Sequence, residues 1–193
     1  DKKVVHEVAA GMRSRDRGIK LMAIEVLGWM KYKPALKQLH REFKRTKSKW
    51  DKDEDMFAEL LQAIGRHGDK SSVKVLMESP FKALTMATGR ARIFGLANIR
   101  DKSALEQVLK GTQMAGDNPP RSWRQMGDKR FLREFQIALT ILTGEDKGND
   151  LEAWRQWYRK NKKTYKVPEA RPEIPDWMRK AWEEFWNEPY YGI

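Results

Sequence analysis

Cysteine is absent from the 193 residues, which excludes disulfides, thiolate chemistry and cysteine-based zinc or iron–sulfur sites. Histidine is scarce, because only His6, His40 and His67 occur, and their spacing fits no metal-binding motif. The sequence also lacks the G-x-x-x-x-G-K-[ST], G-x-G-x-x-G, G-x-S-x-G and H-E-x-x-H motifs. We therefore predict no catalytic residue, no cofactor and no metal site, and we expect that the protein is not an enzyme.

Long hydrophobic runs are absent too. No apolar stretch approaches the roughly 18 residues that a membrane-spanning helix needs, so we expect no membrane insertion. The first residue is Asp1 rather than methionine, and no charged and then apolar leader follows it. This start is typical of a processed chain or of a fragment. An exported protein without its signal peptide is one option, and a cytoplasmic protein is the other.

Positive charge is abundant but unevenly spread. The formal net charge is +12, and residues 1–50 alone carry 14 basic and 5 acidic side chains. Residues 111–166 are also basic, whereas 167–193 carry 3 basic and 6 acidic side chains. A basic body with an acidic tail indicates an anionic partner: a nucleic acid, an acidic protein surface, or the tail of a second copy.

Residues 17–39 predict two short helices joined by a tight turn. Apolar or small residues recur at helical spacing in both halves, at Leu21, Ile24, Leu27 and Gly28 and then at Leu36 and Leu39. Pro34 suits the first turn of the second helix, where its missing N–H leaves no hydrogen bond unmade. Two amphipathic helices of this length cannot bury their apolar faces alone, so the pair requires neighbours of its own kind.

The same pattern occurs twice more along the chain. An apolar residue followed by a small one marks each first helix, at Leu27-Gly28, Ile64-Gly65 and Leu96-Ala97. Two apolar residues follow at constant offsets, at Leu36 and Leu39, Val73 and Leu76, and Leu105 and Val108. We expect the small residues to let the two helices of a pair approach closely near their turn.

Local signals predict how the helices begin and end. Residues 2–13 predict a leading helix that covers the first pair. Asp16 is the expected N-cap of the helix that follows, and Gly144 is expected to end a later one. His67 lies in a turn between two predicted helices and fits a cap better than a metal ligand.

This repeat resembles the HEAT-like family of helical repeats over roughly residues 15–162. The LTG…G.D…W..W arrangement from Leu142 to Trp157 is similar to the terminal repeat of many bacterial HEAT-like proteins. The resemblance implies an all-α fold, a short right-handed α-solenoid of helix pairs. The alternative is a non-repetitive helical bundle with similar spacing. We divide the chain into a repeat domain, 1–163, and a C-terminal part, 164–193.

Several charged groups within the repeats have two interpretations. Lys44, Arg45, Lys47 and Lys49 with Trp50 form either a nucleic-acid patch or a solvated helix end, and the helix end is favoured. Arg90, Arg92 and Arg100 either line one face of the solenoid or are ordinary surface charge. The acids at Glu145, Asp146 and Asp150 fit turn and cap roles better than a cation site.

Two segments are candidates for partner binding. The irregular stretch 111–128 is long for a loop between helices, and its Trp123 is either a contact residue or a core cap. Residues 164–175 are rich in proline and cannot be helical. The short helix predicted after them carries an aromatic stripe, with two tyrosines just beyond it. We interpret these residues as the contact face of an extended arm rather than as an intramolecular lid: Trp177, Trp182, Phe185, Trp186, Tyr190 and Tyr191.

These features favour a non-catalytic interaction scaffold that holds a larger protein complex or filament together. Its partners would be subunits of an enzyme or structural assembly, or copies of itself. A HEAT-like protein that binds nucleic acid without sequence specificity is the alternative, supported by the basic charge. Against the alternative, the aromatic residues concentrate in the acidic tail, where phosphates would be repelled.

Overall fold

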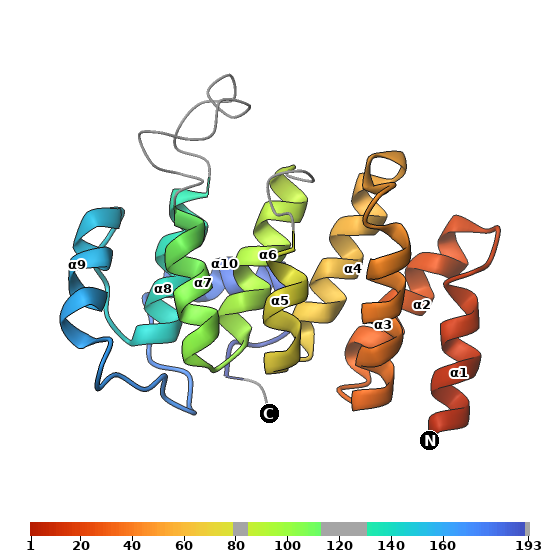
Figure 1. Ribbon diagram of the computed structural model, residues 1–193, viewed down its shortest axis with the longest axis horizontal. Coiled ribbons are helices and arrows are strands. Elements are labelled where there is room, and N and C mark those ends of the chain that lie inside the picture. Colours follow the sequence, from red (N-terminus) through yellow and green to blue (C-terminus); the bar gives the residue numbers. More distant parts are fainter. Residues whose placement is uncertain (79–84, 113–130, 192–193) are drawn as a thin grey trace. The chain divides into compact units, whose positions relative to one another are not determined.

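The computed structural model describes residues 1–78, 85–112 and 131–191, and these residues form an all-α protein. The described residues contain α-helices and two short 3-10 helices, and no strand occurs among them (Figure 1). The chain divides into two compact units, 1–99 and 100–193. The boundary that the sequence suggested, at 163/164, therefore lies inside the second unit.

Each unit contains several helices in chain order. Unit 1 holds α1 Lys2–Gly11, α2 Arg17–Trp29, α3 Lys33–Thr46, η1 Trp50–Lys52, α4 Glu54–Arg66, η2 Lys70–Ser72, α5 Val73–Leu76 and α6 Met86–Asn98. Unit 2 holds α7 Lys102–Gly111, α8 Leu132–Thr143, α9 Leu151–Asn161 and α10 Asp176–Trp186. The segment before α10 is not helical, as its prolines predicted.

Local sequence signals explain where several helices begin and end. The carboxylate of Asp16 accepts a hydrogen bond from the backbone N–H of Ile19, so Asp16 is the N-cap of α2. Asp150 caps α9 in the same way. Gly144 ends α8 with φ 73°, a left-handed conformation that glycine adopts without strain. All three roles were predicted from the sequence, and all three are confirmed.

Helix α4 is the centre of unit 1. It contacts α2 on one side and α6 on the other, and it also contacts α3 and α5 (Figure 1). Helix α1 contacts α2 and α3, so it covers the first helix pair as predicted. The apolar residues that mark the first helices are buried at Leu27, Ile64 and Leu96. Their burial shows that the apolar period of the sequence identifies the core face of each helix.

The small residues allow close approach, but between different helices from those expected. Gly28 of α2 lies against Ala63 of α4, and the Cα atom of Gly65 lies against Gly95 of α6. The contacts therefore join successive first helices, whereas we had expected contacts between the two helices of one pair. Without side chains at these points, the helix backbones approach more closely than larger residues would allow.

We expect Gly28→Ala to lower the free energy of unfolding by about 1–3 kcal/mol, because overpacking forces the backbone to shift. A Cβ atom at residue 28 would lie 2.9 Å from the Cβ and 3.0 Å from the Cα of Ala63. Urea denaturation followed by circular dichroism measures the change. Gly18→Ala, at the exposed start of the same helix, is the control, because its Cβ would meet only a carboxylate oxygen of Asp16, at 3.1 Å, and its effect should be clearly smaller than that at Gly28. Equal effects would contradict the close packing.

Unit 2 holds its proline-rich segment through backbone carbonyls. The guanidinium of Arg100 donates to the carbonyl oxygens of Pro168 and Ala170 at 2.6–2.9 Å, and to that of Ile141 at 2.7 Å. The hydroxyl of Tyr165 donates to the carbonyls at the end of α8, those of Leu142 and Thr143. Residues 165–170 are thus tied to α8 and to Arg100.

Two of the arginines predicted for a solenoid face have other roles in the structure. Arg92 is buried, and its guanidinium donates to the carbonyl of Leu76 at the end of α5. Burial lowers the pKa of Arg92 to about 10. Arg100 is occupied by the carbonyls of its own unit. Neither side chain is ordinary surface charge, and neither is placed to bind a partner.

Candidate functional site

Helix α2 carries an exposed apolar stripe on the side opposite its core face. Ile19, Met22, Val26 and Trp29 are 50%, 65%, 37% and 40% exposed. Their spacing of 3, 4 and 3 places them on successive turns of one side of the helix. We call these four residues the α2 stripe. A single exposed apolar residue needs no explanation, whereas a continuous row of them marks an interaction site.

Charged groups of α4 border the α2 stripe. The guanidinium of Arg66 lies 3.8 Å from the centre of the Trp29 ring, a cation–π contact that fixes the indole at the surface. Glu59 is half-buried, and its pKa is raised, mainly because burial disfavours the charged form and also because Glu25 of α2 is near. The stripe therefore has a held aromatic side chain at one end and ionisable groups along its edge.

The sequence contains a signal for the α2 stripe, although the apolar period predicted only the core side of the helix. Leu21, Ile24 and Leu27 were assigned to the core, and Ile24 and Leu27 are buried. The remaining apolar residues of α2 also repeat at helical spacing, so the helix is apolar on two sides. Four exposed apolar residues on the side away from the core make that side a candidate contact surface.

Two histidines fix the turn regions next to α2. The ring nitrogen Nε2 of His67 lies 3.0 Å from the carbonyl oxygen of Leu27 in α2, to which it donates. Nε2 of His40 lies 3.0 Å from the hydroxyl of Ser72. Burial lowers the pKa of both rings below the ordinary 6.5. His67 is the C-cap residue of α4, consistent with the predicted cap role.

These lowered pKa values predict a pH dependence. Below pH 6.5 the unfolded chain binds protons that the folded chain resists, so the free energy of unfolding falls as the pH drops from 7 to about 5.5. Urea denaturation at a series of pH values measures the slope. His67→Gln retains a side chain that can donate to Leu27 and removes one titrating group, so it should reduce the slope. His6→Gln is the control, since His6 is exposed.

Helix α3 presents a row of positive charge. Lys33, Lys37, Arg41 and Lys44 are exposed at a spacing of 4, 4 and 3, which places them on one side of the helix. None of the four forms an ion pair with another described residue.

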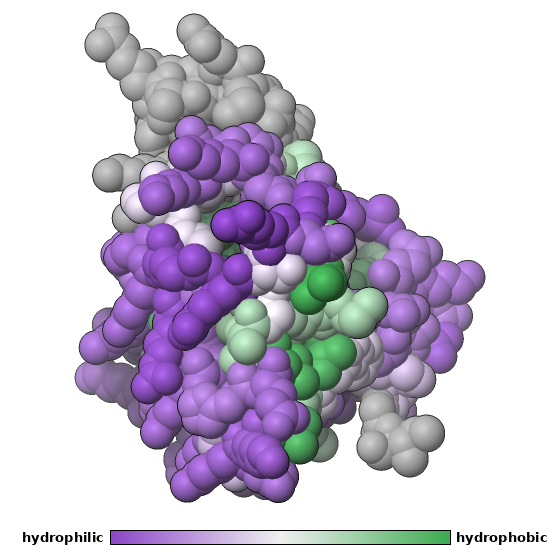
Figure 2. Space-filling model, turned by 90° about the vertical axis from the view of Figure 1, so that its right-hand side faces the viewer, coloured by the Kyte–Doolittle hydropathy of each residue, from purple (hydrophilic) through white to green (hydrophobic). Residues whose placement is uncertain are grey.

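Figure 2 looks toward the α1 end of the molecule and shows hydrophobic residues gathered within a surface that is otherwise hydrophilic. The surface of unit 1 therefore offers both apolar and cationic contacts.

The patch predicted at the end of α3 is partly neutralised. Arg45 donates to both carboxylate oxygens of Glu42, at 2.5 and 3.0 Å, and Lys47 pairs with Glu78. Trp50 begins η1 and is half-buried. The interpretation of this run as a helix end fits these contacts better than a nucleic-acid patch does.

The aromatic residues predicted as arm contacts fall into two groups. Trp182, Trp186 and Tyr190 are fully buried. Trp182 lies 5.5 Å from Trp186 and 6.0 Å from Tyr190 between ring centres, and Arg171 lies over both Trp182 and Tyr190. The hydroxyl of Tyr190 donates to the carbonyl of Pro172 at 3.0 Å. In this structure these three side chains form a packed cluster with no surface to offer a partner.

The other predicted contact residues are more accessible. Trp177 is 38% exposed and Tyr191 is 54% exposed, while Phe185 is half-buried against Trp186. Arg133 lies 5.1 Å from the ring centre of Trp177. Trp123 lies outside the described residues. Among the described contact residues, the structure thus leaves Trp177 and Tyr191 best placed to meet a partner.

Two of the three acidic residues near the end of α8 have the turn and cap roles that we predicted. Asp146 accepts from the backbone N–H of Gly148 in the turn, and Asp150 caps α9, whereas Glu145 forms an ion pair with Lys147. Over residues 1–78, 85–112 and 131–191, no group of three side chains is suited to holding a metal ion. No helix in the same part of the chain is both long and apolar enough to span a bilayer.

No family model matches the sequence, and no curated protein or solved structure is significantly similar to it. The described residues define an all-α protein.

Proposed function

We propose that this chain is a non-catalytic protein-interaction scaffold that holds a larger assembly together. We further propose that its helices form a short right-handed α-solenoid of HEAT-like pairs with a C-terminal arm. Two features support the solenoid. Helix α4 contacts both α2 and α6, so the three first helices form a row in chain order. Small residues lie at the α2–α4 contact and at the α4–α6 contact. Such a row of helices presents extended surfaces, as helical repeats generally do.

The observation that carries the proposal is the α2 stripe. Four apolar side chains, from Ile19 to Trp29, are exposed on successive turns of a helix whose other side is already buried in the core. Covering them with a partner removes apolar surface from water, which is the main driving force of protein association. Aromatic residues such as Trp29 are typical of the residues that dominate interface energetics.

The chemistry around the α2 stripe indicates what partner fits it. Arg17 and Lys20 lie on the core side of α2, where Arg17 pairs with Asp53, but the four exposed cations of α3 belong to the same unit as the stripe. An amphipathic helix with apolar residues on one side and acidic flanks would match both features. The partner is a subunit of a larger assembly or a second copy of this chain, and Trp177 and Tyr191 would supply contacts from the arm.

We expect Met22→Glu to abolish assembly while leaving the fold intact. Met22 is 65% exposed, so a charge there costs little in the free chain but would be buried without a partner charge at the interface. Size-exclusion chromatography of tagged chain from native extract measures the complex, and thermal melting measures the fold. Lys160→Gln lowers the net charge by the same one unit at an exposed position of α9, outside the stripe and the α3 cations, and is the control. Equal loss of complex in both variants would contradict a specific role for the stripe.

Nucleic-acid binding is the second candidate, favoured by the row of four cations on α3, which pair with no other described residue. Each phosphate contact makes binding strongly dependent on salt. A mobility shift of labelled duplex and single-stranded DNA at near-physiological ionic strength tests this candidate. Replacing Lys37, Arg41 and Lys44 together by glutamine should abolish any shift, and Met22→Glu should not. If the wild-type chain binds neither DNA, this candidate is removed.

A further inference from the structure

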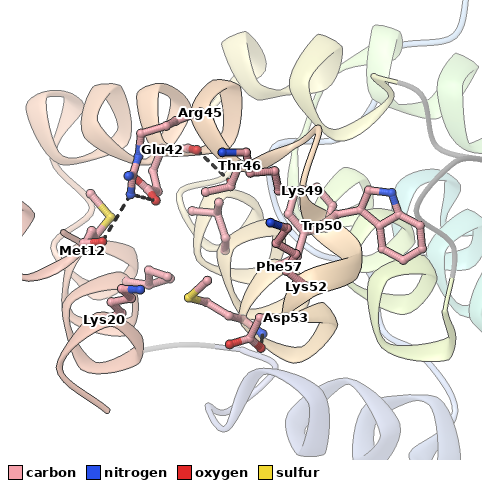
Figure 3. A pocket seen from close by; sticks show the side chains of 13 residues that line it. Met12, Lys20, Glu42, Arg45, Thr46, Lys49, Trp50, Lys52, Asp53 and Phe57 are labelled. Atoms are coloured by element: carbon pink, nitrogen blue, oxygen red, sulfur yellow. Dashed lines mark hydrogen bonds and ion pairs between the residues drawn. The ribbon is translucent and has the colours of Figure 1, made fainter. Parts of the chain in front are cut away.

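Unit 1 contains a cavity of about 250 Å³ between α2, α3, η1 and α4 (Figure 3). Its apolar lining consists of two half-buried side chains, Met56 and Trp50, and four that are fully or almost fully buried: Met12, Ile24, Phe57 and Leu60. Its polar lining includes Lys20, Arg45, Lys49 and Lys52 together with the acids Glu42 and Asp53. The cavity is thus apolar on one part of its wall and charged on another.

Both acidic residues of the cavity are already neutralised by arginines. Arg45 binds the two carboxylate oxygens of Glu42, and Figure 3 shows this pair on the same side of the cavity as Met12. Arg17 binds the two carboxylate oxygens of Asp53 at 2.7 and 2.9 Å. Asp53 also accepts from the backbone N–H of Met56 as the N-cap of α4. The hydrogen bond from Arg17 is the main reason that the pKa of Asp53 is lowered, so this carboxyl stays ionised and occupied.

The three lysines of the cavity, unlike the arginines, are not paired with the carboxylate of any described residue. Lys20, Lys49 and Lys52 form no ion pair or hydrogen bond with other described side chains. They come from three different elements or turns: Lys20 from α2, Lys49 from the turn after α3, and Lys52 from η1. Once the two arginine–carboxylate pairs are accounted for, the lining retains three lysines, of which Lys20 is also near enough to Asp53 to help lower the pKa of that carboxyl. The charge of the lysines is complementary to an anion.

We infer that this cavity is a binding site for a small organic carboxylate with an apolar body. The apolar wall would take the body, and the ammonium groups of Lys20, Lys49 and Lys52 would hold the carboxylate by charge-assisted hydrogen bonds. A cavity of about 150 Å³ lined by aliphatic and aromatic side chains is sufficient for benzene. The larger volume here, about 250 Å³, accommodates one aromatic ring or a short aliphatic chain together with the carboxyl group. This site is separate from the α2 stripe and does not depend on the proposed scaffold function.

The test uses 3-phenylpropionate as the probe and the full chain as the protein. Calorimetric titration measures its affinity, and methyl resonances of Met12, Ile24 and Met56 report where it binds. We expect saturable binding, with shifts confined to these methyl groups. The uncharged analogue 3-phenylpropanol should bind at least about tenfold more weakly, the factor that corresponds to the loss of one charge-assisted hydrogen bond.

Two variants separate the site from general attraction to a basic protein. Replacing Lys20, Lys49 and Lys52 together by glutamine should weaken binding of 3-phenylpropionate by at least about tenfold. The matched control replaces Lys33, Lys37 and Lys74, three exposed lysines that do not line the cavity, and should leave the affinity unchanged. Thr46→Trp places a large side chain at a half-buried position in the lining and should abolish binding, while circular dichroism shows that the fold is retained.

Several results would overturn the inference. Equal binding of 3-phenylpropanol would show an apolar cavity that does not recognise a carboxylate. Equal loss in the two triple-lysine variants would show attraction to net charge alone. Methyl shifts away from the cavity, or no saturation at millimolar probe, would show that the cavity is not a site for this class of ligand.

Discussion

Replacing Trp182 or Trp186 by alanine is expected to lower the free energy of unfolding by about 3–5 kcal/mol, the range for large aromatic residues truncated in a core. Both indoles are fully buried, and they contact each other and, for Trp182, Tyr190. Removing either ring leaves a cavity that the surrounding cluster fills only in part. Urea denaturation, followed by both circular dichroism and tryptophan fluorescence, measures the loss.

Trp177→Ala on the same helix is the control. Its indole is partly exposed, so we expect a change much smaller than that at either buried position. The comparison also separates two roles for α10. If Trp182→Ala leaves stability unchanged and abolishes assembly, the buried cluster must open to bind a partner. That result would contradict a purely structural role for the cluster.

Truncation of Leu27, Ile64 or Leu96 to alanine is expected to cost about 2–5 kcal/mol at each position. Each side chain is buried at the corresponding point of a helix in unit 1, on the side that faces the core. The loss combines the transfer of the removed methyl groups with the cavity left behind. Similar losses at all three positions would support the repeat, since equivalent residues would then have equivalent environments.

Met22→Ala provides the comparison for these core positions. Met22 lies on α2 with Leu27 but is exposed, so its truncation should change stability by less than about 0.5 kcal/mol. A loss at Met22 as large as that at Leu27 would mean that the α2 stripe is covered within the folded chain. Negligible losses at any one of the three core positions would contradict their equivalence.

The starts and ends of several helices could be predicted from the sequence, because they depend on neighbouring residues only. Asp16 and Asp150 were predicted as N-caps because an aspartate directly before an apolar period satisfies free N–H groups. Gly144 was predicted to end a helix because glycine adopts positive φ readily. The all-α class followed from the 3.6-residue period of apolar side chains together with the resemblance to helical repeats.

Contacts between residues far apart in the chain could not be predicted from such local signals. Arg100 binds the carbonyls of Pro168 and Ala170, residues far along the chain, and no local pattern distinguishes it from a surface arginine. The aromatic stripe of α10 predicted an apolar face correctly, but periodicity does not show whether that face meets its own chain or another. The burial of Trp182 and Trp186 was therefore beyond a sequence argument.

The α2 stripe lies between these two cases. Its spacing from Ile19 to Trp29 is visible in the sequence, yet only one side of α2 was predicted to matter, because one apolar face is enough to explain a helix in a core. The second face becomes informative once the structure shows it exposed. Exposure depends on which neighbours cover a helix, and this depends on packing rather than on the helix's own residues.

The central claim is that the α2 stripe contacts a partner protein, and site-specific photo-crosslinking tests it most directly. A photoreactive amino acid replaces Met22 in the full chain within native extract, and a second chain carries it at Lys160, which is exposed on α9. Mass spectrometry then identifies the crosslinked peptides. We predict one dominant adduct from position 22, to an amphipathic segment of a single protein or of a second copy, and its absence from position 160. No adduct at position 22, or the same mixture of adducts from both positions, would contradict the claim.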